Sequence, residues 1–105
     1  MKRITFTIGI GMDKHGSHIH RAEELLNLAS RRVAETFGGY TLTRGSGGWI
    51  APNGELVEES SVVFSVVTEE HREVYASSVA VFLRDLFSQE CVLVTVEDLQ
   101  GAKFV

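Results

Sequence analysis

Hydrophobic and polar residues alternate along two stretches of the chain, and this pattern predicts two half-buried β-strands. Within residues 3–10, every second residue is large and apolar: Ile4, Phe6, Ile8 and Ile10. Residues 61–68 repeat the pattern, with one apolar face formed by Val62, Phe64 and Val66. A period of two, with β-branched and aromatic side chains, is typical of a strand that buries one of its faces.

Between these strands, apolar residues recur at the spacing of an α-helix. From Ile19 to Phe37 they form one stripe: Ala22, Leu25, Leu26, Ala29, Val33 and Phe37. We expect Ser17 to be the N-cap of this helix, because its hydroxyl can accept a hydrogen bond from a free amide of the first turn. The pair Gly38-Gly39 supplies the left-handed residue with which many helices end.

A second helix is expected after Thr68, which would be its N-cap, and it should run to about Ser88. Its buried stripe would be formed by Tyr75, Val79, Phe82 and Leu86. A last long strand is predicted over residues 91–97, where Cys91 would be a small buried thiol. Residues 103–105 could add a short edge strand.

A glycine-rich stretch with a turn signal separates the first helix from the long strand 61–68. Residues 40–44 read as a short strand, and Ala51-Pro52-Asn53-Gly54 suits a type I turn followed by a positive φ. We therefore expect a separate hairpin, in which residues 49–51 pair with residues 55–57.

The resulting order of elements is β-α-β-β-α-β with an inserted β-hairpin. Two split βαβ units with right-handed crossovers give an α+β, ferredoxin-like sandwich, in which two helices cover one face of an antiparallel sheet. With 105 residues, the chain is expected to form a single domain over residues 1–105.

Composition narrows the classes of function. The formal net charge is −4, and Lys and Arg form no dense run, which disfavours a nucleic-acid binder. No apolar run approaches the roughly twenty residues that a membrane span needs. A single cysteine cannot form an internal disulfide, and the N-terminal residues do not read as a signal peptide. We therefore expect a soluble cytoplasmic protein.

The second face of the predicted sheet is too apolar to be left entirely to water. It would carry a mixture of valine, leucine and small polar residues: Thr5, Thr7, Val63, Ser65, Val67, Leu93 and Thr95. A face of this kind is commonly covered by a second copy of the chain. We therefore predict a homodimer or a higher homo-oligomer that associates through this open sheet face.

Three of the four histidines and one aspartate lie within eight residues: Asp13, His15, His18 and His20. Imidazoles at such short spacing can share a transition metal, with the aspartate as a harder ligand. The spacing matches no standard metal site, and a solvated polar loop explains it better. No cofactor is therefore expected, and a transition metal at this loop is the alternative.

The glycine-rich stretch supplies a second group of candidate residues: Arg44, Trp49 and Glu59. A guanidinium and an indole near one another can hold a planar or anionic ligand, or can anchor a protein partner. In the competing interpretation, Trp49 fills the end of the core or an interface between chains, while the carboxylates are solvated. Packing at an interface is the interpretation that we favour.

The same stretch resembles a group of small uncharacterised bacterial and phage α+β proteins. In that group, a Gly-x-Thr strand leads to a Gly-x-Trp hairpin and then to a Gly-x-x-x-x-Glu segment before a long apolar strand. The matching positions, within residues 38–67, are Gly39, Thr41, Gly48, Trp49, Gly54, Leu56 and Glu59. The resemblance implies a ferredoxin-like fold and oligomerisation, and it implies no activity.

These observations favour a self-associating ferredoxin-like domain that binds a small ligand or a protein partner. The alternative is a small metal-binding protein or enzyme that uses the loop from His15 to His20. The acidic charge and the lack of aromatic residues on the open sheet face disfavour an RNA-binding module.

Overall fold

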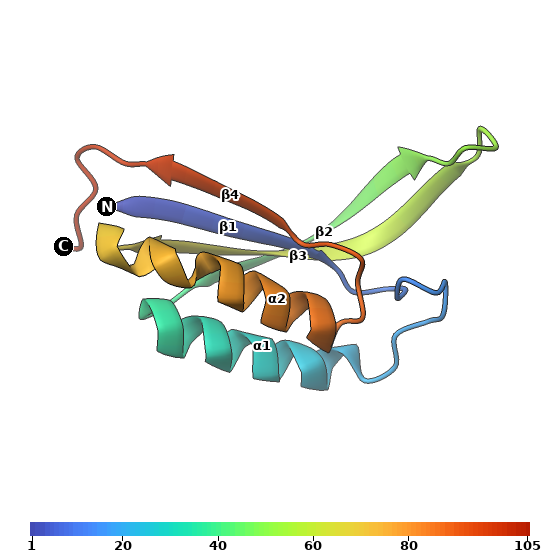
Figure 1. Cartoon of the computed structure of the whole chain (residues 1–105), viewed down its shortest axis with the longest axis horizontal. Helices are drawn as coiled ribbons and strands as arrows, with labels where there is room; N and C mark the ends of the chain where they lie inside the picture. The colour runs from blue at the N-terminus through green and yellow to red at the C-terminus, as the bar shows by residue number, and fades with distance from the viewer.

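The computed structural model describes all residues from Met1 to Val105. Figure 1 shows two helices on one side of a four-stranded sheet, with a two-stranded arm at one end. The elements in chain order are β1 (Lys2–Gly9), α1 (Ala22–Phe37), β2 (Thr41–Ile50), β3 (Leu56–Thr68), the 3₁₀-helix η1 (Glu70–Tyr75), α2 (Ala76–Leu86) and β4 (Leu93–Asp98).

The sheet has the strand order β2-β3-β1-β4, and every neighbouring pair is antiparallel. The central strands β1 and β3 pair along the whole of β1, from Lys2 opposite Thr68 to Gly9 opposite Ser61. This topology, with both helices on one face, confirms the ferredoxin-like α+β fold that the sequence predicts.

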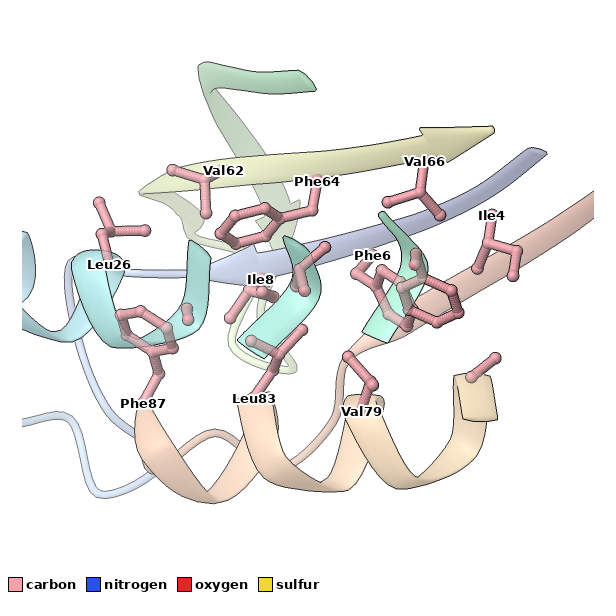
Figure 2. Packing of buried hydrophobic residues seen from close by; sticks show 14 of the residues in the cluster. Ile4, Phe6, Ile8, Leu26, Val62, Phe64, Val66, Val79, Leu83 and Phe87 are labelled. Atoms are coloured by element: carbon pink, nitrogen blue, oxygen red, sulfur yellow. The ribbon is translucent and has the colours of Figure 1, made fainter. Parts of the chain in front are cut away.

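One hydrophobic core lies between the sheet and the helices. Figure 2 shows side chains from β1 and β3 pointing toward those of α1 and α2. The alternation in both strands decides which residues are buried, since Ile4, Phe6 and Ile8 are at most 1% exposed. The ring centroids of Phe6 and Phe37 are 5.9 Å apart, so that the end of α1 is joined to the middle of β1.

The expected inserted hairpin is instead the far end of two long strands. Each strand continues through the glycine-rich stretch, and β2 pairs with β3 from Thr41 opposite Ser65 to Ile50 opposite Leu56. The glycines do not end β2, because their backbone pairs with that of β3. Gly54 has a φ of 87° and its amide donates to the Ala51 carbonyl at 2.8 Å, as the predicted turn requires. We call residues 46–60, which have no third strand beside them, the arm.

Both predicted helix N-caps are wrong. The helix α1 begins at Ala22, after Arg21 in a left-handed conformation, and no side chain caps it. Ser17 is instead part of the preceding loop, where its amide donates to the Asp13 carboxylate at 3.0 Å. Thr68 ends β3, and the second helical segment starts as a 3₁₀-helix without a side-chain cap. At the end of α1, Gly38 has the expected left-handed conformation.

The C-terminal part of the chain differs from the prediction in three places. Cys91 is exposed and lies outside β4, which begins at Leu93. Of the stripe predicted for the second helix only Val79 is fully buried: Tyr75, in the 3₁₀-helix η1, is 50% exposed, and Phe82 and Leu86 are partly buried. The core face of α2 is instead formed by Ala76, Val79, Leu83 and the following Phe87. Residues 103–105 form no strand. None of the helices is long and apolar enough to span a membrane.

Candidate functional site

The open sheet face carries unusually small side chains where the arm leaves the sheet. Strand pairing places Gly9 and Gly45 on either side of Ser61, and Gly47 opposite Glu59. These residues all belong to the face that the helices leave uncovered, because Val62 on the other face is buried. Glycine in a strand allows a ligand or another chain to approach the backbone closely. Where the arm begins, the backbone of the open face is therefore left uncovered by side chains.

Two oxygen acceptors lie close to the space beside Gly9 that a side chain would fill. A Cβ atom at this position would lie 3.0 Å from Gln89 Oε1 and 3.7 Å from Glu59 Oε2. Glu59 is half-buried, and its carboxylate takes part in none of the ion pairs or side-chain hydrogen bonds of the protein. We call Gly9, Glu59 and Gln89 the Gly9 corner. Its two oxygens have no protein donor and suit a cation or a hydrogen-bond donor from outside.

Neighbouring loops hold Gln89 in place. Its side-chain amide donates to the Met12 carbonyl at 2.7 Å and to the Phe87 carbonyl at 3.1 Å. The residue before it, Ser88, has a φ of 51°, and its carbonyl accepts a hydrogen bond from the Lys14 amide at 2.8 Å. A left-handed residue other than glycine persists only where its surroundings fix it. Gln89 Oε1 is therefore presented over Gly9 in one orientation.

The structure brings Glu59 and Trp49 to the same face and sends Arg44 to the other. Trp49 lies opposite Val57, two pairs further along the arm from Glu59, and it is 51% exposed. It therefore does not fill the core of its own chain. Arg44 makes two contacts with the Glu23 carboxylate at the start of α1, Nη1–Oε1 at 2.8 Å and Nη2–Oε2 at 2.9 Å. This hydrogen bonding lowers the pKa of Glu23. It also joins β2, just before the arm begins, to the start of α1.

The histidine loop is held together by Asp13. The Asp13 carboxylate accepts hydrogen bonds from the amides of His15 at 2.8 Å and Ser17 at 3.0 Å, which lower its pKa, and the Ser17 bond has the larger effect. The rings of His18 and His20 meet edge to face with centroids 5.5 Å apart. No group of three His, Cys, Asp or Glu side chains comes together to hold a metal ion. The proposed metal ligands thus gain no support from this geometry.

We expect the double variant H15A/H18A to bind zinc as weakly as the unchanged protein does. The reason is that the Asp13 carboxylate already accepts hydrogen bonds from backbone amides of its own loop, and the imidazoles do not converge with it on one point. Calorimetric titration with zinc chloride measures this directly. Stoichiometric binding by the unchanged protein that is lost in the double variant would show that the loop rearranges into a metal site.

Sequence reasoning identified Glu59 and Trp49 as candidate residues but missed Gly9 and Gln89 as their neighbours. Gly9 interrupts the Thr5-x-Thr7 pattern on the open face, a signal that the sequence contains but that also fits an ordinary turn. Gln89 has no such signal, because its place beside Glu59 depends on how the loop after α2 folds back.

No protein-family model matches the chain, and no similar sequence was found among curated proteins. Solved structures do resemble it. A phage SAM lyase in complex with S-methyl-5'-thioadenosine has a TM-score of 0.68 at 16% identity, over 92% of this chain and 80% of the other. The periplasmic divalent cation tolerance protein CutA from Archaeoglobus fulgidus has a TM-score of 0.66 at 8% identity, over 98% of this chain and 88% of the other. Pyrococcus horikoshii CutA has a TM-score of 0.62 at 13% identity, over 98% and 88%. At these identities the likeness establishes the ferredoxin-like fold alone.

Proposed function

We propose that this protein is a self-associating ferredoxin-like domain that binds a small, positively charged organic ligand at the Gly9 corner. The observation that carries the proposal is the pair of acceptor oxygens, from Glu59 and Gln89, that both lie within 3.7 Å of the Cβ position of Gly9 and have no protein donor. A half-buried carboxylate without a partner is stabilised when a cation binds beside it.

The ligand class that we propose is an adenosyl sulfonium, such as S-adenosylmethionine. The sulfonium and the amino group of this molecule are cations that Glu59 and Gln89 could contact, and the exposed Trp49 indole on the same face offers a surface for a flat purine. The phage SAM lyase of the same fold, with its bound S-methyl-5'-thioadenosine, supports this choice. The CutA proteins of the same fold suggest a metal ion instead, but no group of three metal-ligating side chains lies here.

A lyase reaction on this ligand is a second candidate function, favoured by the same likeness. In the simplest step, an oxygen of the ligand's own carboxylate attacks the Cγ carbon and the Cγ–S bond breaks, with its electron pair remaining on sulfur. The products are S-methyl-5'-thioadenosine and a lactone, and no water, proton donor or protein nucleophile is consumed. Such a step needs only that the ligand is held in the reacting geometry.

Self-association through the open sheet face is the second part of the proposal. Both helices lie on the opposite side of the sheet (Figure 1), so that no helix covers this face. Two large apolar side chains on this face are exposed, Leu93 at 61% and Trp49 at 51%. Large apolar side chains left exposed on an uncovered face are typical of a protein–protein contact.

The test compares two adjacent carboxylates by calorimetric titration with S-adenosylmethionine. Glu59→Gln removes the charge at the corner and should weaken binding about tenfold or more, as expected for a hydrogen bond to a charged group. The matched control is Glu58→Gln, whose side chain lies on the other face of the arm and should change binding less than about twofold. Chromatography of the same samples after incubation reports any S-methyl-5'-thioadenosine formed.

Two results would overturn the binding proposal: no heat of binding at millimolar S-adenosylmethionine, or an equal loss in both variants. Binding without product would retain the binding function and reject the lyase step.

A further inference from the structure

A second hollow lies at the other end of the open sheet face. It has a volume of about 1010 Å³, and three parts of the chain surround it: the sheet ends, the link from α1 to β2, and the C-terminal tail. We call this cavity the tail hollow. Its lining includes six side chains that are polar, charged or aromatic: Arg3, Tyr40, Ser65, Arg72, Lys103 and Phe104. In Figure 1 the C-terminal tail lies near the start of β1, away from the arm. Along β1, Arg3 in this hollow and Gly9 in the Gly9 corner are six residues apart, about 20 Å.

The charge of the tail hollow is opposite to that of the whole chain. The chain has a formal net charge of −4, but the hollow is lined by three cationic side chains, Arg3, Arg72 and Lys103, and by one carboxylate, Glu69. That carboxylate is already 3.3 Å from His71 Nδ1. A concave surface with an excess of positive charge concentrates anions.

The two arginines differ in how firmly they are held. Arg72 Nη1 donates to the Thr36 carbonyl at 3.2 Å, which fixes the guanidinium beside the end of α1 and uses one of its five N–H groups. Arg3 has only a long contact, 3.4 Å, between its Nη1 and Glu97 Oε1, and its side chain is 44% exposed. Lys103 forms no ion pair. Most donors of these three side chains are therefore free to bind an anionic ligand.

Aromatic rings stand beside these cations. The Tyr40 ring packs edge to face against Phe64, with centroids 5.5 Å apart, and remains 41% exposed. Phe104, on the irregular tail, is 80% exposed. One ring is thus fixed against the core and the other is carried by a segment without regular secondary structure. Such a pair can enclose a flat ligand.

We propose that the tail hollow binds a small molecule that joins an anionic group to an aromatic ring. Arg3, Arg72 and Lys103 contact the anion, and Tyr40 and Phe104 contact the ring. The Ser65 hydroxyl, which has no protein hydrogen-bond partner, lies in the floor between them. This ligand is opposite in charge to the one proposed for the Gly9 corner, and the two proposals stand independently.

The test uses 1-naphthyl phosphate, the uncharged 1-naphthol and inorganic phosphate as matched probes. We expect 1-naphthyl phosphate to bind at least about tenfold more tightly than either of the others, since only it satisfies both the cations and the rings. In amide NMR spectra, the shifted signals should include Gly39, Ser65 and Lys103 and exclude Gly9 and Gly47. Equal binding of 1-naphthol would remove the role of the cations, and equal binding of inorganic phosphate would remove the role of the rings.

Three variants locate the site. Arg3→Met should weaken the binding of 1-naphthyl phosphate about tenfold, whereas Arg31→Met, which removes an exposed arginine from α1, should leave it unchanged. Glu97→Gln removes the carboxylate beside Arg3 but keeps the cation, and it should not weaken binding. The same loss in Arg3→Met and Arg31→Met, or no binding at millimolar 1-naphthyl phosphate, would overturn the proposal.

Discussion

Phe64→Ala should lower the free energy of unfolding by about 3–5 kcal/mol, the typical cost of removing a buried phenylalanine. Phe64 is fully buried in the central strand β3, where its ring packs against Tyr40 and lies among the side chains between sheet and helices (Figure 2). The backbone around it is held on both sides, by β1 and by β2, so that the surrounding strands cannot close the cavity. Urea denaturation followed by circular dichroism measures the change.

The matched control is Val81→Ala on α2, where the side chain is 45% exposed and the change should stay within about 0.5 kcal/mol. Both variants are compared with the unchanged protein at one fixed concentration, because association makes apparent stability depend on concentration. A loss below about 1 kcal/mol for Phe64→Ala would mean that this part of the core is loosely packed.

Val63→Lys combined with Leu93→Lys should convert the protein from an oligomer to a monomer. Both residues lie on the open sheet face, on strands β3 and β4, which flank the central strand β1. Leu93 is largely exposed in the single chain, so a lysine there costs little in the monomer, but it would place a charge within an interface. Light scattering at micromolar concentration should show the mass fall to that of one 11.6 kDa chain.

Leu28→Lys provides the control, since this leucine is 56% exposed on α1, on the opposite side of the sheet. It should leave the oligomer intact. A monomeric mass for the unchanged protein would reject self-association through the open face, and a mass unchanged in the double variant would show that a different surface is used.

The sequence predicts the two-layer fold because the spacing of its apolar residues changes from that of a strand to that of a helix where the elements change. Alternation identifies the faces of β1 and β3 residue by residue, and the helical stripe correctly includes Leu26, Ala29, Val33 and Phe37 among the buried residues. These predictions succeed because burial in a two-layer fold follows directly from strand and helix periodicity. Helix starts were wrong where backbone contacts, such as the Asp13 loop, compete with a capping side chain.

The arm and the candidate site were harder to predict because they depend on contacts between distant segments. Residues such as Gly45 and Gly47 have little strand propensity, and they extend only because β3 pairs with them. The same pairing decides that Arg44 and Trp49 lie on opposite faces of the sheet, although they are close in sequence. Gln89 reaches Gly9 through a loop whose path no local pattern encodes.

The arm and the core place different constraints on substitutions in this chain. Because residues 47–59 of the arm pair only with one another and none of them belongs to the core, substitutions at the tip leave the rest of the fold undisturbed. Lineages can therefore change what the tip contacts without first acquiring compensating changes elsewhere. Gly48 would change more slowly, since a side chain there would meet the Leu56 side chain at 3.2 Å and the Val57 carbonyl at 3.3 Å, whereas one at Gly47 would meet nothing within 4 Å. Rapid change at the tip, with Gly48 retained beside it, is thus the pattern that this architecture permits.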